Sequence, residues 1–116
     1  MKFLCVCEGG TVRSGAMAHV LKYEHGQEAI AASWLKLSQE TLDFLSEKWA
    51  DRIILMQPRF LDKFQKHLAK IKVIDVGIDR WVNPLHPELM GIVRKVAGAW
   101  EKEKWGPSDT LLTKVV

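Results

Sequence analysis

The first part of the chain passes from an apolar run, through a pair of glycines, into a helical pattern. The apolar run is Phe3 to Val6, the glycines are Gly9 and Gly10, and the helical pattern covers residues 12–25. A strand that ends in a glycine turn and leads into a helix directs several backbone N–H groups, and the positive end of the helix dipole, at one point. An anion is the ligand that such a point favours. The opening of the chain therefore predicts a phosphate-binding loop between a first strand and a first helix.

Three side chains of this loop point to phosphoryl chemistry. The helix dipole and a nearby guanidinium would stabilise the thiolate of Cys7, so we expect this sulfur to be unusually nucleophilic at neutral pH. Arg13 can supply that guanidinium, and its planar fork can bind two oxygens of a phosphoryl group at once. Ser14 can donate a hydrogen bond to the sulfur. The residues expected to line the phosphate between them are Glu8, Gly9, Gly10, Thr11 and Val12.

Strand and helix patterns alternate through the rest of the chain. Continuous apolar runs are typical of strands buried on both faces, and apolar residues three and four apart are typical of helices. The later strands are expected at residues 28–34, 53–56 and 71–76. The later helices are expected after Ser38 with Leu42, Leu45 and Trp49 buried, from Pro58 with Leu61, Phe64 and Leu68 on one side, and from Leu89 to about Lys104.

This alternation predicts an α/β fold. Right-handed crossovers between successive strands give a three-layer α/β/α arrangement around a four-stranded parallel sheet, in the strand order 2-1-3-4. The first strand then ends at a topological switch point, where open α/β sheets bind their ligands. We expect one domain over residues 1–105 and a C-terminal tail over residues 106–116.

Composition narrows the class of protein. A chain of 116 residues with 47% hydrophobic residues is long enough for one domain with a real core. No apolar run approaches the length of a membrane span, and the net charge of +3 is spread along the chain, so neither a membrane protein nor a nucleic-acid-binding protein is expected. Cys5 is expected to be structural, and a cytoplasmic location fits the two cysteines.

The stretch Cys7 to Ser14 resembles the signature of the low-molecular-weight protein tyrosine phosphatases. That signature is a cysteine, five residues, an arginine and then serine or threonine, placed directly after the first strand. One position differs, because the family usually carries asparagine where this chain has Gly10. The resemblance implies a phosphomonoester hydrolase that acts through a phosphocysteine intermediate, with no metal and no cofactor.

The same resemblance suggests a general acid and two aromatic walls. In these phosphatases an aspartate, usually followed by proline and an aromatic residue, protonates the leaving oxygen. The matching stretch makes Asp79 the candidate acid and Trp81 an aromatic wall, with Arg80 in place of the proline. Asp75 is the rival acid, although a structural hydrogen bond is the expected role for it. Trp34 would form a second wall.

The same residues suggest a class of substrate and two alternative functions. Phosphotyrosine in a protein, or a small aryl phosphate, is the expected substrate, and Glu8 at the rim would disfavour acidic flanks. One alternative is a phosphocarrier similar to the cysteine-phosphorylated subunits of sugar phosphotransferase systems, which relay phosphate without the arginine. Another is a non-catalytic domain that binds phosphate or a phosphopeptide. Arg13 and Asp79 favour hydrolysis.

Overall fold

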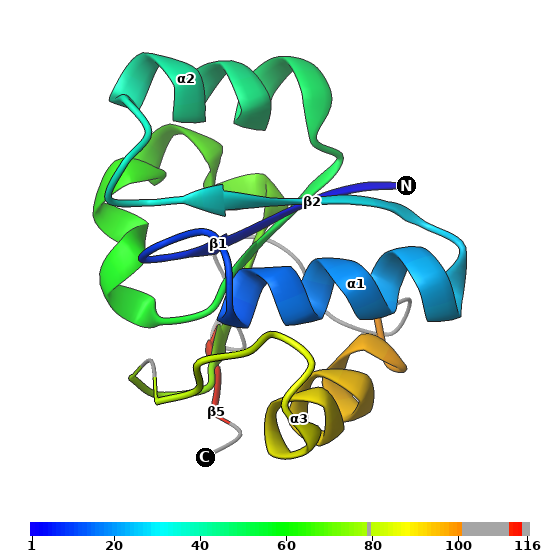
Figure 1. Cartoon of the computed structure of the whole chain (residues 1–116). Helices are drawn as coiled ribbons and strands as arrows, with labels where there is room; N and C mark the ends of the chain where they lie inside the picture. Colours follow the sequence, from blue (N-terminus) through cyan, green and yellow to red (C-terminus); the bar gives the residue numbers. More distant parts are fainter. Residues whose placement is uncertain (79, 101–111, 115–116) are drawn as a thin grey trace.

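A computed structural model describes residues 1–78, 80–100 and 112–114 of the chain. A twisted sheet lies between two layers of helical segments (Figure 1). The strands are β1 (Lys2–Cys7), β2 (Glu28–Ser33), β3 (Arg52–Leu55), β4 (Ile71–Asp75) and β5 (Leu112–Lys114). The helices are α1 (Arg13–His25), α2 (Gln39–Phe44) and α3 (Pro87–Ala97), with a π-helical turn η1 (Leu45–Trp49) and two 3₁₀ segments, η2 (Pro58–Lys63) and η3 (Gln65–Lys70).

The sheet confirms the predicted fold class. Its described strands are all parallel and lie in the order β2-β1-β3-β4-β5. The first four therefore have the predicted order 2-1-3-4. A short fifth strand, β5, pairs with β4 and extends the sheet. It falls in the segment 106–116 that the sequence assigned to a tail; the remaining residues of that segment lie outside the described part of the chain.

The central strands and the facing sides of the helices form the core. β1 and β3 are almost wholly buried, as expected for strands covered on both faces. On one face α1 packs against α3, and on the other face lie α2 and η1 (Figure 1). This three-layer packing fixes the direction in which α1 leaves the end of β1.

Local signals account for three of the helix boundaries. Gly26 ends α1 in a left-handed conformation at φ 65°, and its N–H donates to the carbonyl of Leu21. Ser38 caps α2 by accepting from the N–H of Thr41 at 3.1 Å. Pro87 occupies the first turn of α3. That helix ends at Ala97 rather than near Lys104, and residues 101–104 lie outside the described part of the chain.

The segment after β3 differs from the predicted single helix. Residues 58–70 form two 3₁₀ segments separated at Phe64, whose φ of −125° is not helical. The break turns the chain so that Phe60, Phe64 and His67 are all buried, whereas Leu61 is only partly buried. Phe60, Phe64 and His67 are spaced as on one face of an α-helix, so the apolar pattern does not distinguish a single α-helix from two 3₁₀ segments with a break between them.

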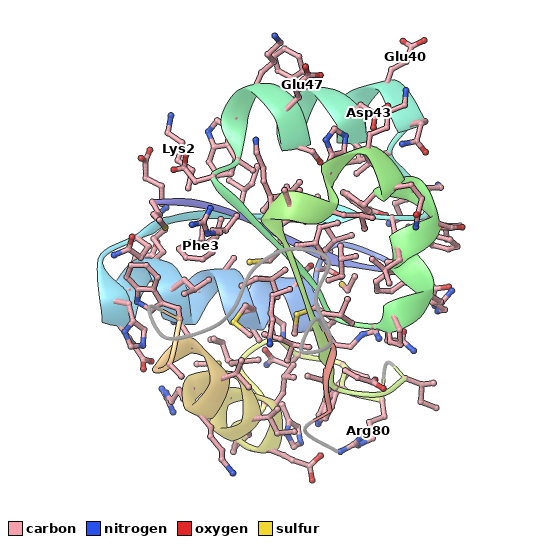
Figure 2. All side chains as sticks on the ribbon, turned by 180° about the vertical axis from the view of Figure 1, so that it is seen from behind. Lys2, Phe3, Glu40, Asp43, Glu47 and Arg80 are labelled. Carbon is pink, nitrogen blue, oxygen red and sulfur yellow. The ribbon has the colours of Figure 1, made fainter. Side chains whose placement is uncertain are left out.

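A buried histidine joins this segment to the outer helix. His67 Nε2 lies 2.9 Å from the Asp43 carboxylate on α2, and Gln39 donates to the same oxygen at 3.0 Å. Figure 2 shows Asp43 on this outer layer together with Glu40 and Glu47. The hydrogen bond from His67, followed by that from Gln39, lowers the pKa of the Asp43 carboxyl below its ordinary value. The pair therefore ties α2 to η3.

This geometry predicts an acid-dependent contribution of Asp43 to stability. A carboxyl whose folded pKa is lowered stabilises the fold above its unfolded pKa of about 3.9, and that stabilisation disappears as the pH falls through the folded value. The difference in free energy of unfolding between the wild type and Asp43→Asn should therefore be present at neutral pH and shrink as the pH falls below about 4. Urea unfolding over a pH series measures this. Glu40→Gln, on the same helix but exposed, is the control, and a pH-independent difference for Asp43→Asn would contradict the linkage.

Candidate active site

Four loops meet at the carboxyl edge of the sheet. They follow β1, β2, β3 and β4, and hydrogen bonds join them: Trp34 N–H donates to the Cys7 carbonyl at 2.9 Å, and Arg13 contacts both Gln57 and Gly77. In a parallel sheet the carboxyl ends of neighbouring strands lie together, and this edge is where open α/β sheets bind ligands. The loop predicted from the first residues therefore has contributions from three distant parts of the chain.

Cys7 and Ser14 lie side by side at the base of the loop. The Cys7 Sγ is 3.1 Å from the Ser14 Oγ, a distance at which the hydroxyl can donate to the sulfur. Both side chains are buried, with only 1% of Cys7 exposed. Cys5 is buried on the same strand, and burial, together with the neighbouring Cys7, raises the pKa of its thiol far above the ordinary value. Cys5 therefore stays a neutral thiol.

Arg13 is a fully buried cation with one edge that has no hydrogen-bond partner among the described residues. Its Nη1 donates to the Gln57 Oε1 at 2.6 Å and to the Gly77 carbonyl at 2.8 Å. Among the described residues, its Nε and Nη2 have no hydrogen-bond partner. These two nitrogens form the edge of the guanidinium that grips two oxygens of an oxyanion side by side. A buried charged group with unused donors is costly, and an anion would satisfy it.

The backbone of the loop turns its carbonyls toward β2. The Cys7 carbonyl accepts from Trp34, and the Glu8 carbonyl accepts from the Ser33 hydroxyl at 2.7 Å and from the Leu35 N–H at 3.1 Å. In a planar trans peptide the C=O and the following N–H point in opposite directions. The N–H groups of Glu8 and Gly9 therefore point away from β2. No side chain of the described residues caps the start of α1, so no such cap accepts from the backbone N–H groups of its first turn.

Gly10 occupies the position where the resembling phosphatases usually carry asparagine. Its φ is 71°, and a Cβ built there would lie 2.6 Å from the Ser33 nitrogen and 2.8 Å from the Ala32 carbonyl carbon. The loop lies so close to the end of β2 that a side chain has no room. The glycine is thus required by close approach as well as by backbone conformation.

The rim residues Glu8 and Trp34 are both held by cations. Glu8 pairs with Arg59 at 3.2 Å in an exposed ion pair, and its effect on substrates with acidic flanks stays a prediction. The Trp34 indole donates to Asp62 at 2.8 Å, and the Arg59 and Lys63 charges lie 5.1 and 4.8 Å from its ring centre. The Trp34 backbone lies next to the loop, and its role as an aromatic wall stays a prediction. Thr11 is exposed and Val12 is partly buried at the start of α1.

The loop after β4 carries the predicted acid and the second aromatic residue. Asp79 lies outside the described residues. Asp75 accepts from the Gly77 N–H at 2.9 Å, the structural hydrogen bond expected for it. Trp81 is 5% exposed and its indole donates to Glu88 at 2.9 Å, so it packs against α3 and offers little ring surface to a substrate.

Arg80 is held against two neighbours, Trp81 and Glu88. Its guanidinium lies 4.1 Å from the Trp81 ring centre and donates to Glu88 at 2.9 Å. The hydrogen bond from Arg80, and then that from Trp81, lowers the pKa of the Glu88 carboxyl. The loop is therefore fastened to the first turn of α3 by a shared carboxylate.

Gln57 is the site residue that the sequence alone did not single out. It follows β3, the neighbour of β1, so strand order would have placed it beside the loop. The described residues contain no group of three or more His, Cys, Asp or Glu side chains placed to hold a metal ion, and no described helix is long and apolar enough to span a membrane.

Comparisons with known proteins gave no match: no protein-family model, no curated protein and no solved structure matches this chain. The interpretation of the site accordingly depends on its geometry and on the motif.

The crowding at Gly10 predicts that Gly10→Ala disrupts the loop. A left-handed alanine costs about 1–2 kcal/mol, and forcing a side chain into a filled space costs roughly 1–3 kcal/mol more. Gly26→Ala is the matched control, because Gly26 has nearly the same φ but nothing within 4 Å of a Cβ. Urea unfolding should show a clearly larger loss for Gly10→Ala, together with weakened phosphate binding. Equal losses for the two variants would mean that β2 does not confine the loop.

Proposed function

We propose that this protein hydrolyses phosphomonoesters through a phosphocysteine intermediate, with an aryl phosphate or phosphotyrosine as substrate. The observation that carries the proposal is the pairing of a buried Cys7–Ser14 contact with a buried Arg13 whose Nε and Nη2 are unpartnered among the described residues. A nucleophile and an oxyanion grip lie within one loop. A cytoplasmic location stays part of this proposal.

The first step is attack of the Cys7 thiolate on phosphorus. The P–O ester bond breaks as the S–P bond forms, and the leaving oxygen takes a proton from a general acid. Arg13 and the loop N–H groups bind the equatorial oxygens, where charge is spread in the transition state. Water then attacks phosphorus and gives a proton to the same acid group. The S–P bond breaks, which releases phosphate and restores the thiolate.

Arg13 is also what favours hydrolysis over a phosphocarrier. A carrier needs only a nucleophile and a cradle of N–H groups, whereas Arg13 is buried and anchored at Nη1 by two acceptors from distant loops. Holding a guanidinium in this way is useful when charge develops on phosphoryl oxygens.

The test is hydrolysis of p-nitrophenyl phosphate by the wild type, Cys7→Ser and Arg13→Lys, with and without a chelator. Wild-type activity should resist the chelator, and Cys7→Ser should be inactive. Arg13→Lys keeps the charge but loses the fork, so kcat should fall by about two orders of magnitude or more.

Thermal unfolding controls for misfolding of the variants. An inactive wild type that still binds phosphate would favour a carrier or a binding domain. Activity that survives Cys7→Ser, or near wild-type activity of Arg13→Lys, would contradict the mechanism.

Asp79 is the general acid in this proposal, and the nature of the leaving group tests it. A poor leaving group needs protonation more than a good one does. Asp79→Asn should therefore slow phenyl phosphate far more than p-nitrophenyl phosphate, while Asp75→Asn should slow both alike, since Asp75 holds the Gly77 N–H. Steady-state kcat/KM for both substrates measures this. If Asp75→Asn rather than Asp79→Asn slowed phenyl phosphate more than p-nitrophenyl phosphate, Asp75 would be the general acid.

A further inference from the structure

Gln57 lies between a buried and an exposed guanidinium. Its Oε1 accepts from Arg13 Nη1 at 2.6 Å and from Arg59 Nε at 3.4 Å. Arg59 in turn pairs with Glu8 on the phosphate loop. We propose that Gln57 is the positioning residue for Arg13, and that its lack of charge leaves the positive charge of Arg13 available to the bound phosphoryl group. This inference rests on the anion site of the proposed function.

Positioning follows from the geometry of Arg13. The guanidinium is planar, so two acceptors on Nη1 fix both its place and the plane in which the Nε and Nη2 donors lie. One acceptor, the Gly77 carbonyl, comes from the loop after β4; the other is the Gln57 amide. The Gln57 Oε1 faces two N–H donors, one from Arg13 and one from Arg59. The amide NH₂ group could not accept from them, so only one of the two orientations of the amide satisfies both hydrogen bonds. Removing the Gln57 acceptor should therefore let the Arg13 guanidinium rotate.

The electrostatic part of the proposal follows from the charge of the two groups that accept from Arg13 Nη1. Both acceptors on Nη1 are neutral, and no described carboxylate lies within ion-pair distance of Arg13. Two acidic side chains of the surrounding loops have other partners, because Glu8 pairs with Arg59 and Asp75 accepts from the Gly77 N–H. A buried cation that has no counter-charge among the described residues interacts strongly with an incoming anion. A carboxylate at position 57 would neutralise part of that charge and repel the phosphoryl group.

The decisive variant is Gln57→Glu, which keeps the shape and the acceptor but adds a charge. Phosphate affinity, measured by calorimetry, should fall by roughly ten- to a hundredfold, on the scale of one added unit charge near the anion in a partly screened site. The melting temperature without phosphate should stay level or rise, because the new carboxylate pairs with Arg13 and Arg59. The stabilisation that phosphate gives should shrink. Gln65→Glu adds the same charge on η3, where Gln65 donates only to the Leu61 carbonyl, and should leave phosphate affinity unchanged.

Gln57→Leu separates positioning from charge. It removes the acceptor without adding a charge, so kcat for p-nitrophenyl phosphate should fall more than KM rises. Wild-type phosphate affinity in Gln57→Glu would overturn the electrostatic role. Wild-type kcat in Gln57→Leu would overturn the positioning role. A parallel loss of melting temperature and affinity in both variants would mean that Gln57 only stabilises the fold.

The two proposals fail in different ways. Wild-type protein that binds phosphate but does not hydrolyse esters would contradict the phosphatase while leaving the Gln57 affinity measurement valid. Wild-type protein that binds no phosphate would overturn both. Active wild type with an unaltered Gln57→Glu variant would overturn this inference alone.

Discussion

The burial of the Arg13 guanidinium is the constraint on which the rest of the site depends. A charged group with no solvent access must find hydrogen-bond acceptors in the protein or in a ligand. Two acceptors come from Gln57 and Gly77, and the Phe60 ring lies 5.8 Å from the charge centre. These contacts draw the loops after β3 and β4 toward the loop after β1. The Nε and Nη2 edge has no partner among the described residues, and it is the edge to which we assign the anion in our proposal.

The loops around this edge are held by surface charges and by close packing. Glu8 and Arg59 connect the phosphate loop to η2, and Glu88 joins Arg80 and Trp81 to α3. Gly10 allows the backbone to lie directly on the end of β2. Where the resembling phosphatases use an asparagine and a proline, this chain uses a glycine and an arginine, and each change has a structural counterpart.

The order of elements and the sheet topology could be predicted from the sequence, because both depend on apolar patterning and on right-handed crossovers. The single helix predicted from Pro58 was wrong. Its apolar spacing suits one face of an α-helix, and Phe60, Phe64 and His67 are buried, but the backbone breaks at Phe64 into two 3₁₀ segments that this spacing does not encode. The short strand β5 could not be predicted either, since three residues carry too little pattern to separate a strand from a tail.

The sequence by itself determined the contacts within the first loop. Cys7 and Ser14 are seven residues apart, and a strand, a glycine turn and a helix start bring such a pair together by local backbone geometry. Only the tertiary structure decided what holds Arg13, because Gln57 and Gly77 are 44 and 64 residues away from it. Contacts at that separation depend on strand order and on how the layers pack, and no local spacing encodes them.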